Sequence, residues 1–119
     1  MLKCVNKVTL MGFLGTDPEL FYGEGGSVQA VIHLVTSEPW KDNKIGKINQ
    51  NEDWHHVILF KRFAEIAKKN LKKGSNIYIE GKLKTHFHEK NGQRIKYTEI
   101  HAMDFQMLDA SPYKRQENL

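Results

Sequence analysis

The sequence contains a single cysteine, Cys4, only three prolines and no long apolar run. One thiol cannot form an internal disulfide, which is typical of a chain from a reducing compartment. No segment approaches the ~18 consecutive apolar residues of a membrane span, and the first residues lack the apolar core of a signal peptide. These absences predict a soluble cytoplasmic protein that does not act at a membrane.

The positive charge of the chain is concentrated in one segment. At 119 residues there is room for one domain with a modest core. The net charge is only +4, yet residues 61–96 hold eleven Lys or Arg against three acids. A basic segment of this kind favours a polyanionic partner, although a solvated basic helix would give the same count.

The six histidines do not form a recognisable metal or catalytic motif. His55 and His56 are adjacent and diverge on a strand, so they cannot chelate one ion together. His86 and His88 share a face and could join His101, but no carboxylate or thiol completes a familiar ligand pattern. A nucleophile triad and a phosphate-binding loop are also absent from the sequence. We therefore expect a binding protein, with no catalytic residues, no metal and no cofactor. A metal-dependent nuclease is a remote alternative.

The spacing of apolar residues predicts mostly strands. Alternation predicts strands at 5–14, 27–37, 54–60, 76–85, 94–101 and 103–108. Residues 62–73 have helical spacing instead, with Gly74 where a left-handed cap would end the helix. Asn91-Gly92 is a two-residue hairpin signal. The polar segment 38–53 predicts a long irregular loop.

This order of elements indicates a particular small barrel. Three strands, one helix and two further strands joined by a hairpin are the plan of the OB-fold, a five-stranded Greek-key barrel. We expect an all-β OB-fold domain with one helix and a protruding hairpin over residues 1–109. Residues 110–119 are expected to form a short flexible tail.

The strand that contains Trp54 and Phe60 carries large flat side chains on one face. Period two places these two rings together, while Val57 and Leu59 point the other way. Rings on an open face next to cations suit unpaired nucleotides, because bases stack on aromatics and phosphates pair with cations. Trp40, in the Lys-rich polar segment, is a further candidate. A place in the core is nevertheless the commoner position of a single aromatic.

Several motifs in near-constant spacing resemble the bacterial single-stranded DNA-binding protein family. They are VNKV at 5–8, LGTDPE at 14–19, TSEPWKD at 36–42, WH at 54–55, VILF at 57–60, AEIA at 64–67, LKKGS at 71–75, IYIEGKL at 77–83 and ML at 107–108. The resemblance spans residues 5–108. It implies a protein that coats single-stranded DNA, without sequence preference, during replication, recombination and repair.

The resemblance also implies roles for individual residues. Trp40, Trp54 and Phe60 match the principal base-stacking positions of the family. His88 stands where the family has a third tryptophan, and the adjacent Phe87 is a possible substitute. The implied phosphate contacts are Lys7, Arg62, Lys73 and Lys84, with His56 and His86 where the family more often has Arg. His55 and Tyr78 match positions near subunit contacts, so they are expected at a subunit interface.

The implied assembly is a homotetramer in the cytoplasm, associated with the nucleoid. Family members usually carry a long linker with an acidic tip that recruits other proteins. The sequence ends at Leu119 without such a tip, so recruitment of replication and repair proteins is not expected from it. The runner-up is a primosome-type or RNA-binding accessory protein with the same fold.

Overall fold

The computed structural model describes residues 2–108, so the expected tail at 110–119 lies outside the described residues. The elements in chain order are β1 (Val8–Leu14), β2 (Glu19–Tyr22), a 3-10 turn (Glu24–Gly26), β3 (Val28–Asp42), β4 (Lys47–Phe60), α1 (Arg62–Asn70), β5 (Asn76–Lys90) and β6 (Gln93–Met107). Within this part of the chain, no helix combines the length and apolar character needed to cross a membrane.

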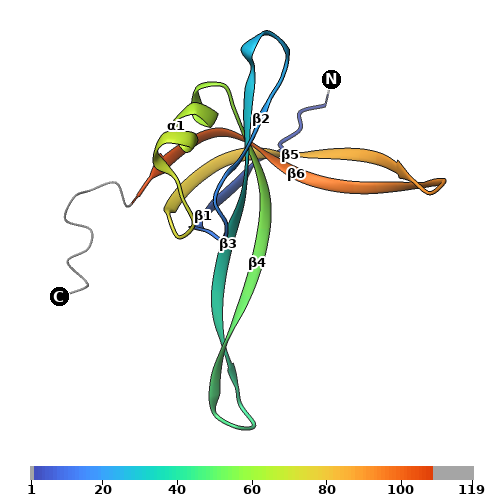
Figure 1. The fold of residues 1–119 in the computed structure, drawn as a ribbon. Coiled ribbons are helices and arrows are strands. Elements are labelled where there is room, and N and C mark those ends of the chain that lie inside the picture. Colours follow the sequence, from blue (N-terminus) through green and yellow to red (C-terminus); the bar gives the residue numbers. More distant parts are fainter. Residues whose placement is uncertain (1, 109–119) are drawn as a thin grey trace.

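Five strands close into a barrel, as the sequence predicts. The sheet runs β1-β5-β6-β4-β3-β2, and an additional pairing between β1 and β3 closes it (Figure 1). The short strand β2 extends the sheet from the outer edge of β3. All pairings are antiparallel except that of β4 with β6. This closed barrel with one helix confirms the all-β OB-fold prediction.

The barrel interior is filled by the alternating apolar side chains of its strands. Val57 and Leu59 of β4 are fully buried, and so are Leu34 of β3 and Ile77 of β5. The helix α1 adds two small buried residues, Ala64 and Ala67. The outward faces of the strands are therefore free to carry the side chains that meet a ligand.

The segment predicted as an irregular loop is instead the outer part of a long β-hairpin, with its turn. Strands β3 and β4 remain paired out to Asp42 and Lys47, so residues 38–53 lie in a two-stranded arm that projects from the barrel (Figure 1). The prediction was wrong because it relied on alternating apolar residues, which mark only strands with a buried face. This arm is solvent-exposed and is held by backbone pairing. Its turn is local: Gly46 has a φ of 67° and donates its N–H to the carbonyl of Asp42 at 2.7 Å.

A second arm is formed by β5 and β6. Asn91 and Gly92 both have positive φ, 54° and 77°, which gives the predicted two-residue turn. The strands are longer than predicted, because the segments at 94–101 and 103–108 form one strand with a register shift opposite Glu80 and Gly81. Period two places Leu83 on the inward face with Ile77 and Ile79, yet it is 47% exposed because it lies where the arm leaves the barrel.

The helix is shorter than predicted and ends differently. It stops at Asn70, and Leu71 is already extended, with φ −101° and ψ 144°. Gly74 is therefore not the helix cap. Its φ of 92° serves the turn in which Ser75 donates to the carbonyl of Lys72, and its own N–H reaches the carbonyl of Leu14. This turn fixes the segment that carries Lys73.

Candidate nucleic-acid interface

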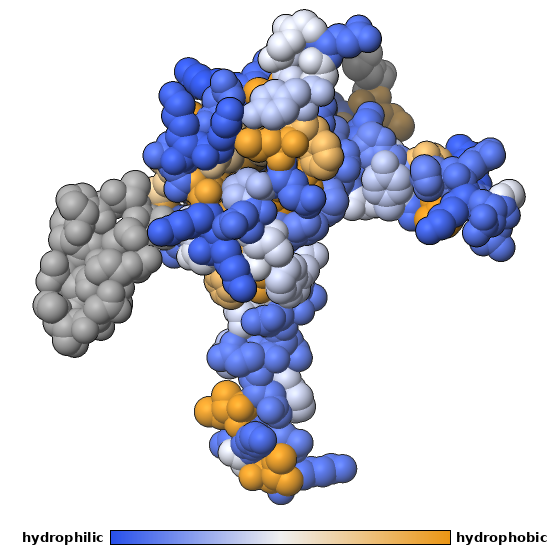
Figure 2. Space-filling model, in the orientation of Figure 1, coloured by the Kyte–Doolittle hydropathy of each residue, from blue (hydrophilic) through white to orange (hydrophobic). Residues whose placement is uncertain are grey.

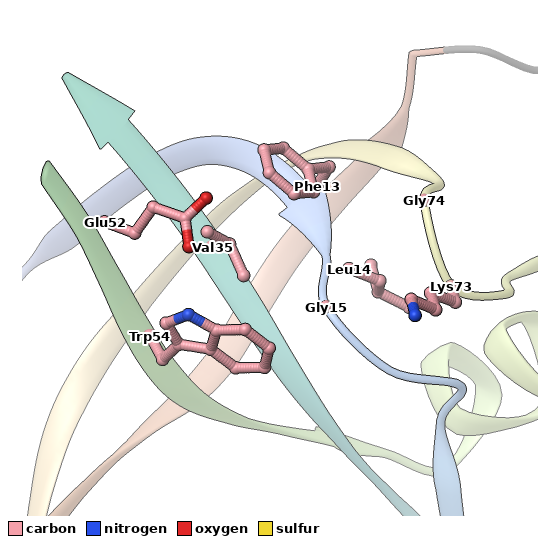
Figure 3. A pocket seen from close by; sticks show the side chains of 8 residues that line it. All are labelled: Phe13, Leu14, Gly15, Val35, Glu52, Trp54, Lys73 and Gly74. Atoms are coloured by element: carbon pink, nitrogen blue, oxygen red, sulfur yellow. The ribbon is translucent and has the colours of Figure 1, made fainter. Parts of the chain in front are cut away.

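Trp54 stands at the edge of a shallow pocket between β1, β3 and β4. The register places it opposite Val35 on β3, and 55% of its surface is exposed. The pocket has a volume of about 260 Å³ and is shown in Figure 3. Its lining consists of Phe13, Leu14, Gly15, Val35, Glu52, Trp54, Lys73 and Gly74. The pocket thus combines a flat ring with one cation, Lys73, and one anion, Glu52. A flat ring and a cation are the combination that holds a base and its phosphate.

Gly15 sets the position of the Trp54 ring. A Cβ at this residue would lie 2.4 Å from Cη2 and 2.5 Å from Cζ3 of the indole, closer than any atom can pack. The absence of a side chain at Gly15 therefore allows the ring to lie against the start of the turn after β1. The sequence gave no sign of this contact, because it joins residues that are far apart in the chain.

We predict that Gly15→Ala weakens binding of single-stranded DNA without removing any aromatic group. The added methyl must displace the Trp54 ring, which the sequence predicts to stack on bases. A displaced ring would stack in a poorer geometry, so affinity should fall by about three- to thirtyfold, part of the stacking contribution of ~1–3 kcal/mol. Titration of the variant and of the unmodified protein with oligo(dT) measures the difference in affinity. An unchanged affinity in a folded variant would show that the ring position does not matter for binding.

Trp40 lies far along the first arm. It is 43% exposed and pairs with Asn49 on β4. The register puts Trp40 on the face of the arm opposite to Trp54, because Trp40 lies an odd number of positions, five, after Val35, the partner of Trp54. Ile45 and Ile48 near the arm tip are each 67% exposed and form the apolar spots seen there in Figure 2. Trp40 is thus accessible, but it does not share a pocket with Trp54.

Phe60 lies at the barrel end of the same face as Trp54. Its ring is half-buried and packs edge-on against His101 of β6, with ring centroids 4.9 Å apart. Ile58, between Phe60 and Trp54 on this face, is only 5% exposed. The face predicted to be open is therefore covered in its middle. Next to this covered part, His56 is exposed and its ring meets that of His33 edge-on at 5.3 Å.

The two candidate stacking residues on the second arm do not lie on the same face. Phe87 pairs with Lys96 and His88 pairs with Ile95, so these neighbours point to opposite sides of the β5–β6 arm. Phe87 is 54% exposed, and the guanidinium of Arg94 lies 4.0 Å from its ring centroid. Phe87 therefore cannot occupy the position of His88. A base could stack on Phe87 only on the face of the arm that also carries Arg94, opposite to the face that carries His88.

The candidate phosphate contacts are exposed but dispersed. Arg62 is the first residue of α1, Lys73 lines the Trp54 pocket, and Lys84 pairs with Glu99 across the second arm. Lys7 has an acidic neighbour, since its Nζ is 3.9 Å from Oε1 of Glu80. Of these cations, only Lys73 lines the pocket beside a candidate stacking ring.

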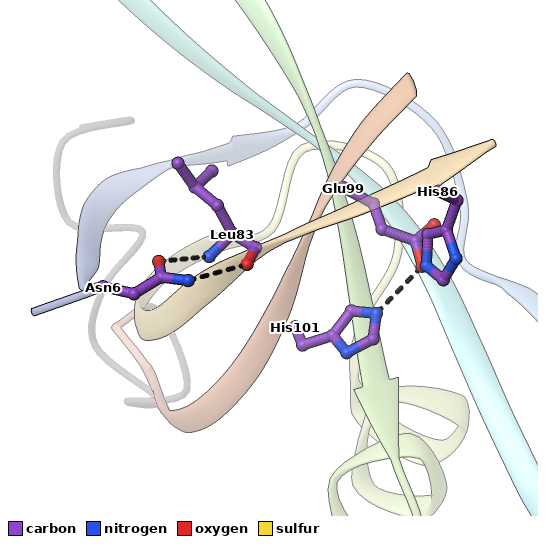
Figure 4. A network of polar contacts seen from close by, with 5 residues as sticks. All are labelled: Asn6, Leu83, His86, Glu99 and His101. Atoms are coloured by element: carbon purple, nitrogen blue, oxygen red, sulfur yellow. Dashed lines mark hydrogen bonds and ion pairs between the residues drawn. The ribbon is translucent and has the colours of Figure 1, made fainter. Parts of the chain in front are cut away.

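His86 belongs to a polar network that the sequence did not indicate. Its Nε2 lies 2.7 Å from Oε1 of Glu99, and Nε2 of His101 lies 2.8 Å from the same oxygen (Figure 4). Partial burial alone would raise the pKa of Glu99, but hydrogen bonds from His101 and His86 hold that pKa below its ordinary value. Glu99 thus keeps a negative charge on a face predicted to meet phosphate.

The two predicted interface residues each have a partner within the chain. His55 Nε2 lies 2.8 Å from the hydroxyl of Thr36. The hydroxyl of Tyr78 donates to Glu80 at 2.6 Å, and this hydrogen bond raises the pKa of Tyr78 above its ordinary value. These contacts hold both side chains in place. The assignment of both residues to a subunit contact stays a prediction.

The closed barrel, its arms and its exposed rings beside cations define an OB-fold of the kind that binds oligonucleotides. Residues 5–108 match the model of the Single-strand binding protein family, and the chain belongs to this family. The resemblance recognised from the sequence motifs is thereby confirmed.

Two solved structures illustrate the relationship. The chain is similar to the SSB of Plasmodium falciparum, solved in complex with ssDNA, with 30% sequence identity and a TM-score of 0.80. That match covers 92% of this chain and 99% of the other. The chain is also similar to a deletion mutant of the single-stranded DNA binding protein from Thermus aquaticus, with 28% identity and a TM-score of 0.74. Here 89% of this chain matches 51% of that protein.

Proposed function

We propose that this protein binds single-stranded DNA without sequence preference and coats it during replication, recombination and repair. The observation that carries the proposal is the Trp54 pocket, where a ring with 55% of its surface exposed stands beside Lys73 in a chain of the Single-strand binding protein family. Every base has a face that can stack on an aromatic ring, so such a surface does not select a sequence. No step of this function breaks a covalent bond, and it needs no cofactor.

The bound strand is proposed to run over the exposed rings and cations described above. Trp54 with Lys73 is the strongest position, and Trp40 and Phe60 are further stacking residues. Arg62 and Lys84 would contribute to the attraction of phosphate, which is long-ranged and weakened by salt. Lys7 contributes less, because Glu80 offsets its charge.

The functional unit is proposed to be a homotetramer. Exposed apolar side chains on β1 and β6 support association, since Met11 is 63% exposed and Met103 is 65% exposed. Met11 pairs with Tyr78, one of the predicted interface residues. Exposed apolar surface of this kind marks contacts between proteins. Sedimentation equilibrium at several chain concentrations measures the mass, and a monomer throughout would contradict the tetramer.

Tryptophan fluorescence tests the function directly. Titration with oligo(dT) should quench the emission strongly, whereas duplex DNA of equal length at the same salt should not, because its bases are already stacked on each other. An equal response to both would leave only general electrostatic attraction and contradict the proposal.

Two further arms of the same experiment address the alternatives. Titration with oligo(U) compares RNA with DNA, and clearly tighter binding to RNA would favour the accessory RNA-binding protein. Cleavage of labelled oligo(dT) in the presence of Mg²⁺ or Zn²⁺ would favour the nuclease. We expect neither outcome.

A further inference from the structure

Two imidazoles and one carboxylate converge on the face shared by β5 and β6, and no part of the DNA-binding mechanism requires this arrangement. His86 comes from β5, while Glu99 and His101 come from β6 (Figure 4). One potential ligand atom from each of the three residues lies within 4.8 Å of the other two. His88, which the sequence pattern grouped with His86, is not a member of this cluster.

We propose that His86, Glu99 and His101 bind a divalent transition metal ion, of which Zn²⁺ is the best candidate. Two neutral imidazole nitrogens and a carboxylate oxygen are a donor set that zinc accepts, with a fourth position left for water or another ligand. Imidazole also suits Co²⁺, Ni²⁺ and Cu²⁺, whereas Mg²⁺ and Ca²⁺ prefer oxygen ligands alone. The ion would replace the hydrogen bonds as the group that joins the three side chains.

The distances from each imidazole to the carboxylate fit this exchange with small movements, and the two imidazole nitrogens lie within 4.8 Å of each other. The two histidine nitrogens lie 2.7 and 2.8 Å from the Glu99 oxygen. Ligand atoms around a tetrahedral zinc ion are about 3.3 Å apart when each lies ~2.0–2.1 Å from the metal. Each contact therefore needs to lengthen by roughly half an ångström, which rotation of the side chains can supply.

The imidazoles are already held in place by aromatic neighbours. His86 stacks on Tyr97 with ring centroids 5.3 Å apart, and His101 packs edge-on against Phe60 at 4.9 Å. The side chains of Glu99 and His101 are only 14% and 20% exposed, and that of His86 is 35% exposed. A site whose ligands are fixed before the ion arrives loses less conformational entropy on binding.

A bound ion would also change the charge of the proposed DNA surface. Glu99 is a single negative charge paired across the strands with Lys84 and bonded to His101, which packs on Phe60, and a divalent ion would turn it into a site with a net positive charge. This consequence rests on the proposed function: the loaded protein should bind oligo(dT) more tightly, because phosphate oxygens are attracted to the ion. The metal site itself does not depend on it.

Metal binding is measured first, without DNA. Chelator-treated protein without a histidine tag is titrated with ZnCl₂ by calorimetry, and we expect saturation at one ion per chain that excess Mg²⁺ does not prevent. CoCl₂ should give the visible absorption of a four-coordinate ion. Glu99→Gln and His86→Gln should each weaken Zn²⁺ binding by at least about tenfold, as loss of a metal-site contact does.

Matched variants separate this site from other histidines and from the thiol. His88→Gln removes a neighbouring imidazole on the same strand face, and Cys4→Ser removes the exposed thiol. Neither variant should alter the affinity for Zn²⁺. Absence of saturable binding, unchanged affinity in both Glu99→Gln and His86→Gln, or an equal loss in His88→Gln would overturn the site.

The DNA consequence is tested separately with oligo(dT), comparing metal-free and Zn²⁺-loaded protein and the Glu99→Gln variant. Tighter binding only in loaded unmodified protein supports the coupling. Zn²⁺ binding without any change in oligo(dT) affinity overturns the coupling and leaves the site standing. Failure of oligo(dT) to bind in either state contradicts the proposed function instead.

Discussion

Leucine at both Trp54 and Phe60 is expected to weaken oligo(dT) binding by at least about 2 kcal/mol, roughly thirtyfold, because each base proposed to stack there would lose an aromatic partner worth ~1–3 kcal/mol. Leucine is chosen because it keeps an apolar side chain at the half-buried Phe60 while removing the flat ring. Fluorescence anisotropy of labelled oligo(dT) measures the loss, since the tryptophan signal itself changes in these variants.

Matched variants show whether the loss belongs to stacking. Trp54→Phe with Phe60→Tyr keeps both rings and should retain most of the affinity. Phe21→Leu on β2 removes an exposed ring that is not part of the proposed surface, and it should have little effect. The unfolding midpoint of each variant is measured alongside. A double leucine variant that folds normally and binds like the unmodified protein would exclude these two rings from the DNA surface.

Three residues of β4 could be placed from the sequence by period two, although Ile58, only 5% exposed, departs from the alternation. Val57 and Leu59 are fully buried and Trp54 is exposed, as period two requires. The hairpin at Asn91 and Gly92 was equally readable, because few residue pairs accept two positive φ angles in succession. Both signals are local, so one sequence is enough to carry them.

Features that depend on pairing between distant strands were not readable. The first arm has no buried face, so its polar residues gave no periodicity, although they form a regular ladder. Glu99 reaches His86 only through the register of β5 with β6, which no local pattern specifies. The contact between Gly15 and Trp54 likewise joins the end of β1 to β4. In each case the missing information is which strands meet, and at which residues.

Closure of the barrel depends on a close approach between β1 and β3. Only Phe13 and Leu14 pair with β3, opposite Val35 and Leu34. Just before them, a Cβ added at Gly12 would lie 2.1 Å from the carbonyl oxygen of Val35. Because that oxygen is backbone, no change of side-chain rotamer can relieve the contact, and one of the strands must move.

Gly12→Ala is therefore expected to destabilise the protein by about 3 kcal/mol, at the upper end of the cost of overpacking. Alanine would reduce the entropy of the unfolded chain and so stabilise the folded protein by ~0.4–1 kcal/mol. The cost of the contact with the Val35 carbonyl is larger. Urea denaturation followed by circular dichroism measures the difference, with an expected fall in midpoint of about 1–3 M.

The control is Gln29→Ala on β3, since Gln29 is exposed and belongs neither to the core nor to the exposed apolar side chains of β1 and β6, and it should change stability by less than about 0.5 kcal/mol. All variants are compared at one chain concentration, because association of folded chains would add to the apparent stability. A Gly12→Ala protein as stable as the Gln29→Ala protein would mean that β1 and β3 are free to separate here. The pairing of Phe13 and Leu14 with β3 would then not be what keeps the Trp54 pocket in shape.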